Sequence, residues 1–178
     1  MSQIVIVSGP PGAGKSTVCE ALCARYDRTV HLETDQLYGS IRMGFIAPWK
    51  PGSMRQNLMV SRAAARAATA FAQEQYGVFI DGVIGPAHLP TYLEELRPAG
   101  VPVHYAVLLP PLDVIVRRAT ERDKRIAGAG DMFERVHGMF VDAPHSWTLD
   151  TSDMTAQKAA DAVMEACGRG ECLVWPPP

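Results

Sequence analysis

Short runs of apolar residues alternate with longer amphipathic stretches along the whole chain. The first run, 4–7, is continuous and β-branched, which is typical of a strand buried on both faces of a parallel sheet. Further strands are expected at 30–33, 78–80, 103–109 and 147–149. Helical patterns are expected at 15–26, 54–76, 90–97, 112–123 and 155–167. This alternation predicts an α/β fold whose parallel strands are joined by right-handed crossovers.

Some segments show neither the strand pattern nor the helical pattern. Residues 39–52 mix glycine, proline and aromatic residues, and we expect a loop or a broken helix there, beside the functional site. The Ala-Gly-Ala-Gly sequence at 127–130 suits a mobile segment, and the tail 175–178 is expected to be extended. Ser152 or Asp153 is expected to cap the last helix. No repeat or linker interrupts the pattern, so residues 1–178 are expected to form a single domain.

The composition narrows the classes of partner. Lys and Arg number 17 against 19 Asp and Glu, a net charge of -2, so no overall positive charge favours nucleic acid or an anionic membrane. The net charge does not exclude a local basic patch. No apolar run approaches the roughly 20 residues that span a bilayer, and no secretory signal is recognisable. We therefore expect a cytoplasmic protein without a membrane partner and leave its oligomeric state open.

The cysteines and histidines suggest no metal site by their spacing. Cys19 and Cys23 are four apart in an expected helix, and Cys167 and Cys172 form a second local pair. A four-cysteine zinc site has tighter spacing, so we expect small buried hydrophobic side chains in a reducing compartment. The histidines are expected to be mostly structural, with His104 in or beside a strand.

The turn after the first strand carries the most specific motif. Residues 9–17 read Gly-Pro-Pro-Gly-Ala-Gly-Lys-Ser-Thr and match G-x-x-x-x-G-K-S/T, with a buried strand before and an amphipathic helix after. Backbone amides and the helix N-terminus of such a loop bind phosphate, a lysine reaches the β/γ-phosphates, and a serine hydroxyl binds Mg²⁺. The residues assigned to the nucleotide are Gly9, Gly12, Ala13, Gly14, Lys15, Ser16 and Thr17.

With its P-loop near residue 9 and an arginine-rich helix late in the chain, the sequence resembles the small P-loop kinases. This group includes adenylate, shikimate and gluconate kinases and chloramphenicol phosphotransferase. The resemblance implies a three-layer P-loop NTPase fold, a five-stranded parallel sheet in the order 2-3-1-4-5, and a small lid at about 118–132. It also implies ATP and Mg²⁺ as cofactors. AAA-type ATPases share the Gly-Pro-Pro-Gly sequence, but they carry an additional helical domain for which this chain has no room.

Two carboxylates close the second expected strand. Asp35 lies just past it, and phosphoryl transfer to an alcohol needs a carboxylate that orients the hydroxyl and accepts its proton. Glu33 is expected to point the same way if the strand alternation continues. Shikimate kinase has two aspartates with this spacing, so the resemblance implies Asp35 as the base and Glu33 as a partner of magnesium-bound water. A helix cap is the alternative for Asp35.

Asp81 ends the apolar run 78–80, as the carboxylate of a Walker B strand does, and is assigned to Mg²⁺ together with Ser16. Asp81-Gly82 resembles the Asp-Gly of adenylate kinase. The Pro-Arg that follows in adenylate kinase is absent here, which argues against a nucleoside monophosphate as acceptor. A turn aspartate is the alternative.

Arginines gather near the expected lid. Arg118, Arg122 and Arg125 share one face of a helix, while Arg117 turns aside. The spacing of the first two resembles the adenylate kinase lid and implies that Arg118 stacks on adenine. Arg122 and Arg125 are assigned to the charge of the migrating phosphoryl group. A solvated helix face is the alternative. The resemblance also implies that residues 150–152 pass the adenine ring.

These features predict an ATP- and Mg²⁺-dependent phosphotransferase that phosphorylates a hydroxyl group of a small molecule, either antibiotic-like or another metabolite. Two rival functions stay open: a P-loop ATPase or nucleotide-binding regulator, and a polynucleotide 5′-hydroxyl kinase, which would need a basic groove. Side chains expected to frame the acceptor near Asp35, or to pack that irregular segment, are Tyr38, Arg42, Phe45, Trp49 and Arg55.

Overall fold

The computed structural model describes residues 2–122, 130–141 and 147–176. Its strands are β1 (Ile4–Ser8), β2 (Thr29–Glu33), β3 (Gly77–Gly82), β4 (Val103–Leu108), β5 (Thr148–Leu149) and β6 (Leu173–Trp175). Its α-helices are α1 (Lys15–Cys23), α2 (Thr34–Gly39), α3 (Met54–Gln73), α4 (Leu89–Leu96), α5 (Leu112–Arg122), α6 (Gly130–Val141) and α7 (Ala156–Arg169), with a short 3₁₀ turn η1 (Arg97–Ala99) after α4.

Five strands pair in parallel in the order β2-β3-β1-β4-β5, which confirms the predicted sheet. In the centre, Val7 of β1 lies beside Asp81 of β3, and Asp81 lies beside Glu33 of β2. All five strands therefore end at the same edge of the sheet, where α/β proteins bind their ligands. At this edge the P-loop follows β1, Asp35 lies just after β2, and Asp81 lies in the last two residues of β3.

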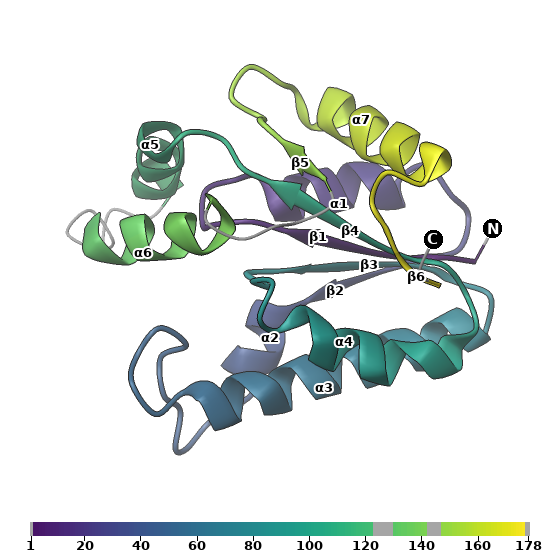
Figure 1. Cartoon of the computed structure of the whole chain (residues 1–178), viewed down its shortest axis with the longest axis horizontal. Helices are drawn as coiled ribbons and strands as arrows, with labels where there is room; N and C mark the ends of the chain where they lie inside the picture. Colours follow the sequence, from purple (N-terminus) through teal and green to yellow (C-terminus); the bar gives the residue numbers. More distant parts are fainter. Residues whose placement is uncertain (1, 123–129, 142–146, 177–178) are drawn as a thin grey trace.

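Helices cover both faces of the sheet, giving the three layers expected (Figure 1). Along β1, Ile4 and Ile6 pack with buried residues of α3 and α4, whereas Val5 and Val7 pack with those of α1 and α7. The apolar run of β1 is continuous because each face of the strand meets a helical layer. α5 and α6 lie beyond the carboxyl ends of the strands (Figure 1).

Three elements were not expected from the sequence. β6 pairs antiparallel with β4 through Val103 and His104, so the sheet has a sixth strand in addition to the five parallel ones. It fits there because the two-residue β5 pairs only with the carboxyl half of β4. The short α2 and the longer α6 were also missed. Both have turn-like or glycine-containing sequences that weaken the helical signal.

The start of α7 corrects a further expectation. Thr155 is the N-cap, and its side-chain oxygen accepts a hydrogen bond from the Lys158 amide at 3.3 Å. Ser152 or Asp153 was expected there. Instead, the amide of Ser152 donates to Asp150 Oδ1 at 2.8 Å, a local turn that delays the helix. Among the helices that the structure describes, none combines the length and the hydropathy needed to cross a membrane.

Candidate active site

The P-loop joins β1 to α1, and its glycines are required by geometry. Gly9, Gly12 and Gly14 have φ angles of 141°, 86° and 93°, a region that side chains disfavour. A Cβ atom on Gly9 would lie 2.1 Å from the Leu108 carbonyl oxygen, and one on Gly12 would lie 2.4 Å from that of Ile115. The loop is thus packed against the end of β4 and against α5, and its shape depends on glycine.

Lys15 begins α1 and folds back across the loop. Its Nζ donates to the Pro10 carbonyl oxygen at 3.1 Å. Burial lowers the pKa of Lys15, and the negative charges of Asp81 and Asp35 act in the opposite direction. The ammonium group therefore lies under the influence of two carboxylates, one at the end of β3 and one at the start of α2.

Asp81, at the end of β3, is buried and is held by neighbours on two sides. His31 Nε2 lies 3.3 Å from Asp81 Oδ2. Burial on its own would raise the pKa of Asp81, but hydrogen bonds from His31 and Ser16 and the charge of Lys15 lower it overall. The carboxylate is thus ionised beside a serine hydroxyl. The sequence indicated Asp81 and Ser16 but missed His31, which is 50 residues away along the chain.

Asp35 lies in the first turn of α2, not on an extension of β2. The strand alternation expected to align it with Glu33 ends at Glu33 itself. Asp35 is exposed and lines a cavity together with Lys15 and Asp81. Glu33 accepts a hydrogen bond from Gln36 at 2.6 Å and is not among the residues that line this cavity. Its role as a partner of magnesium-bound water stays a prediction.

Two cavities meet at the P-loop. The smaller one, about 280 Å³, lies between the loop, α5 and the start of α7. Arg118 lines it and donates from Nη2 to the carbonyl oxygens of Thr151 and Ser152, both at 2.8 Å. The Thr151 hydroxyl donates in turn to the Ala13 carbonyl oxygen at 3.0 Å. The segment after β5 is therefore linked to the P-loop through these hydrogen bonds. The family resemblance implied that this same segment, 150–152, passes the adenine ring.

Arg122 lines both cavities, together with Gly12, Gly14 and Thr17. Its positive charge acts on Lys15 and lowers the pKa of that side chain. This puts Arg122 beside the boundary between the two cavities, and its role toward a transferring phosphoryl group stays a prediction. Arg125 and the rest of residues 123–129 of the predicted lid at 118–132 lie outside the described residues, so their roles stay predictions.

The larger cavity, about 570 Å³, opens on the other side of the P-loop. Of the side chains expected near Asp35, Tyr38 and Trp49 line it, whereas Arg42, Phe45 and Arg55 do not. Apolar and aromatic side chains dominate its wall, among them Val60, Val83, Ile84, Tyr92, Met132, Val136 and Met139. The polar lining residues missed in the sequence include Asn57, Ser61, His88 and Arg135. They come from α3, the β3–α4 connection and α6, which no local motif links.

One polar atom in this wall has no partner. Within the described residues, His88 Nε2 is the buried side-chain nitrogen or oxygen without a hydrogen bond. Burial lowers the pKa of His88, which favours the neutral ring. Asn57 differs, because its Oδ1 accepts from the Tyr38 hydroxyl at 3.0 Å and its Nδ2 donates to the Pro48 carbonyl oxygen at 2.9 Å. His88 thus lines the cavity with a buried ring nitrogen whose hydrogen-bonding capacity is unused.

A family model described as an AAA domain matches residues 4–137, a range that includes the P-loop, Asp35, Asp81 and Arg122. No curated protein sequence matches the chain. The structure is similar to that of an APS kinase from Mycobacterium tuberculosis in complex with AMPPNP and APS, with a TM-score of 0.72, 19% identity, and coverage of 94% of this chain and 98% of that one.

Two further solved structures are similar over nearly the whole chain. The tunicamycin resistance protein of Deinococcus radiodurans has a TM-score of 0.64 and 22% identity, with 99% of this chain and 100% of that one covered. A shikimate kinase from Acinetobacter baumannii in complex with shikimate has a TM-score of 0.60 and 19% identity, with 96% and 94% covered. At these identities the likeness establishes the fold, which is that of the P-loop kinases.

Proposed function

The chain belongs to the AAA domain family, and from this premise we propose that it is an ATP- and Mg²⁺-dependent phosphotransferase acting on a hydroxyl group of a small molecule. The observation that supports this most is the meeting of two cavities at the P-loop. Lys15, Asp35 and Asp81 line the larger cavity, and Arg122 lines both. An ATPase needs only the nucleotide side, whereas a kinase needs a second compartment for its acceptor.

The residues present fit a bound Mg²⁺ ion. Ser16 supplies a hydroxyl oxygen and Asp81 a carboxylate whose pKa is lowered in part by the Ser16 side chain, and both residues line the larger cavity. Oxygen donors of this kind, completed by phosphate oxygens and water, are the ligands that Mg²⁺ prefers. When bound, the ion would offset negative charge on the β- and γ-phosphates.

In the reaction we propose, the acceptor oxygen forms a bond to the γ-phosphorus while the bond from that phosphorus to the bridging oxygen of ADP breaks. The proton of the acceptor hydroxyl passes to the Asp35 carboxylate. Lys15 and Arg122 offset the charge on the transferring group. The backbone amides of the P-loop orient the phosphates, because its glycines let the main chain approach them closely.

The larger cavity favours an acceptor with an apolar or aromatic body. A volume of about 570 Å³ lies within the range of small-molecule sites, and the wall is mainly apolar with a few polar groups. Trp49 and Tyr38 offer aromatic faces near Asp35, and His88 offers an unpartnered nitrogen. An antibiotic-like molecule or a similar metabolite suits this wall better than a nucleic acid end, which would need a basic groove.

An acceptor screen with γ-labelled ATP tests the proposal. Hydroxyl-bearing metabolites, antibiotics and nucleic acid 5′ ends are incubated with the enzyme, and label transfer is measured. Asp35→Asn is expected to reduce acceptor-dependent transfer by about 10²–10⁴-fold while slow ATP hydrolysis persists. The matched control is Asp27→Asn, a change at an exposed aspartate between α1 and β2 that is expected to leave transfer unchanged.

Each alternative function has its own outcome. Transfer to 5′ ends alone would make the protein a polynucleotide kinase. ATP hydrolysis without any acceptor, equal in Asp35→Asn and the parent, would contradict the kinase assignment and favour an ATPase or regulator.

A further inference from the structure

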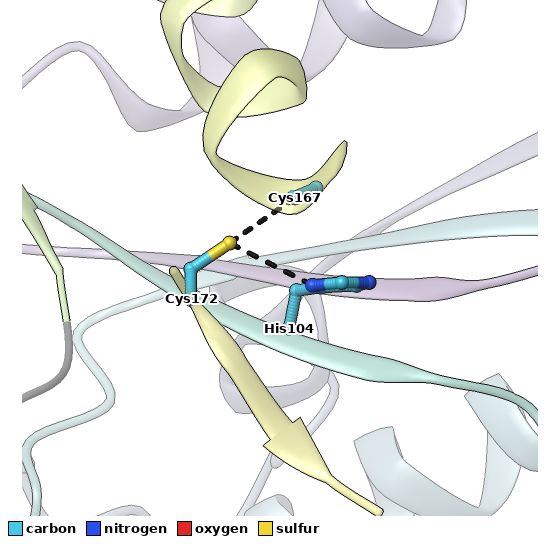
Figure 2. A group of neighbouring side chains, drawn as sticks. All are labelled: His104, Cys167 and Cys172. Carbon is cyan, nitrogen blue, oxygen red and sulfur yellow. Dashed lines mark hydrogen bonds between the residues drawn. The ribbon is translucent and has the colours of Figure 1, made fainter. Parts of the chain in front are cut away.

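Three potential metal ligands, His104, Cys167 and Cys172, lie close together (Figure 2). His104 lies on β4, Cys167 near the end of α7, and Cys172 in the turn before β6. Their ligand atoms all lie within 4.8 Å of one another, and all three residues are buried. The two Sγ atoms are 3.3 Å apart, and Cys172 Sγ is 3.6 Å from His104 Nδ1.

The backbone around the cluster is fixed independently of these side chains. Gly170 closes α7 in the left-handed conformation, and the Glu171 amide donates to the Ala166 carbonyl oxygen at 3.0 Å. The carbonyl oxygen of Cys172 accepts from the Tyr105 amide on β4 at 2.8 Å. Helix end, turn and strand are thus held together before any ligand binds, which lowers the entropy cost of assembling a site.

We propose that His104, Cys167 and Cys172 form a binding site for a thiophilic divalent cation of the Zn²⁺ class. In a tetrahedral site with Zn–S bonds of about 2.3 Å and Zn–N bonds of about 2.0–2.1 Å, neighbouring sulfurs lie about 3.8 Å apart and sulfur and nitrogen about 3.5 Å apart. The observed sulfur–nitrogen distance of 3.6 Å already matches. The observed sulfur–sulfur distance of 3.3 Å has to open by about 0.5 Å.

The charge balance also favours a divalent ion. Two thiolates and a neutral imidazole around a 2+ cation give a site of zero net charge, which burial penalises least. Three protein ligands leave the fourth position to water or another small donor.

The position of the site indicates a structural role. His104 is four residues before Leu108, the residue against which Gly9 of the P-loop packs, and this separates them by about 13 Å along the strand. A bound ion would tie the end of α7 and the start of β6 to β4. It would therefore stabilise the fold without taking part in phosphoryl transfer, so this inference stands apart from the proposed function.

Reconstitution of the reduced, metal-free protein with Zn²⁺ or Co²⁺ alone tests the site. We expect one equivalent to bind, and the Co²⁺ form to show thiolate-to-metal charge transfer and strong ligand-field absorption typical of tetrahedral coordination. Zn²⁺ at about 100 times its dissociation constant should raise Tm by about 5–10 °C. Cys172→Ser should weaken binding by about 100-fold or more, whereas the control Cys23→Ser should bind as the parent does.

Several results would overturn the site. They are the absence of a charge-transfer band in the parent protein, binding that Cys172→Ser leaves unchanged, and a reduced protein that takes up no metal after a Cys167–Cys172 disulfide is broken. If Cys172→Ser does not fold, His104→Gln retains a polar side chain and removes the nitrogen ligand. Its Co²⁺ spectrum must then differ from that of the parent in the ligand-field region, or the site is wrong.

Discussion

The two cavities that meet at the P-loop differ in how their polar groups are satisfied. On the nucleotide side, Arg118 is bonded to the segment after β5, and Thr151 links that segment to the P-loop. On the acceptor side the wall is mainly apolar, and His88 Nε2 has no partner. The wall of the smaller cavity is thus tied together by Arg118 and Thr151, whereas the wall of the larger cavity combines the bonded pair Tyr38 and Asn57 with one unpartnered nitrogen. Substitutions on the two sides should therefore affect different kinetic constants.

Lys15→Ala should have the largest effect, because this side chain folds across the P-loop and lines the larger cavity together with Asp35 and Asp81. Loss of the ammonium group leaves charge on the transferring phosphoryl group unbalanced, and kcat/KM should fall by about 10³-fold. Steady-state kinetics with labelled ATP measures this. Lys158→Ala, on the exposed face of α7, is the matched control and should leave kcat/KM unchanged. Equal activity of both variants would remove the P-loop from the mechanism.

Gly12→Ala should disrupt the wall that the two cavities share. A left-handed φ of 86° and a Cβ placed 2.4 Å from the Ile115 carbonyl oxygen should together lower the free energy of unfolding by about 2–4 kcal/mol. Denaturant titration of the nucleotide-free protein measures the loss. Gly39→Ala, where an added Cβ meets nothing within 4 Å, should change stability little. A Gly12→Ala protein as stable as the parent would contradict the packing of the loop against α5.

Arg118→Gln should affect the smaller cavity and leave the larger cavity unchanged. Without its bonds to the carbonyl oxygens of Thr151 and Ser152, the nucleotide-side segment loses its link to α5. The KM for ATP should rise by about 10-fold, because a charge-assisted hydrogen bond contributes about 1.5–3 kcal/mol, while the KM for the acceptor stays the same. Arg117→Gln, one residue away and exposed, should leave both constants unchanged. A rise in the acceptor KM alone would reverse the assignment of the two cavities.

His88→Phe should have the smallest effect and should be confined to the acceptor side. It removes the free Nε2 atom and retains an aromatic ring in the wall. The KM for an identified acceptor should rise by about 5–10-fold, the loss of one neutral hydrogen bond, with the KM for ATP unchanged. His88→Gln, which keeps a hydrogen-bonding group, should recover part of the loss. An unaltered acceptor KM in both variants would mean that this nitrogen does not contact the acceptor.

The P-loop could be predicted from the sequence, because its motif is local. The residues from Gly9 to Thr17 are contiguous, and the buried strand and helix around them define a P-loop without any tertiary information. Asp81 was found because an apolar run ends at it. The order of the five parallel strands came from the family resemblance and is confirmed.

The acceptor side was harder, because its wall is assembled from segments far apart in the chain. His88 and Arg135 carry no local pattern, and both α2 and α6 were missed as helices. The Glu33–Asp35 alignment failed since the chain turns into α2 directly after Glu33. The cluster of His104, Cys167 and Cys172 could not be predicted from the sequence for the same reason. Residues 104 and 172 come together through the pairing of β4 with β6.

The pairing of β6 has a practical consequence. Val103 of β4 lies beside Ile4 of β1 on one side and beside Trp175 of β6 on the other. With neighbouring strands about 4.8 Å apart, β1 and β6 lie about 10 Å from each other on the two sides of β4, at the end of the sheet remote from the P-loop (Figure 1). A short peptide could therefore join β6 to β1 in a circularly permuted protein. Attaching the protein to a surface through β6 would leave the edge of the sheet that carries the P-loop accessible.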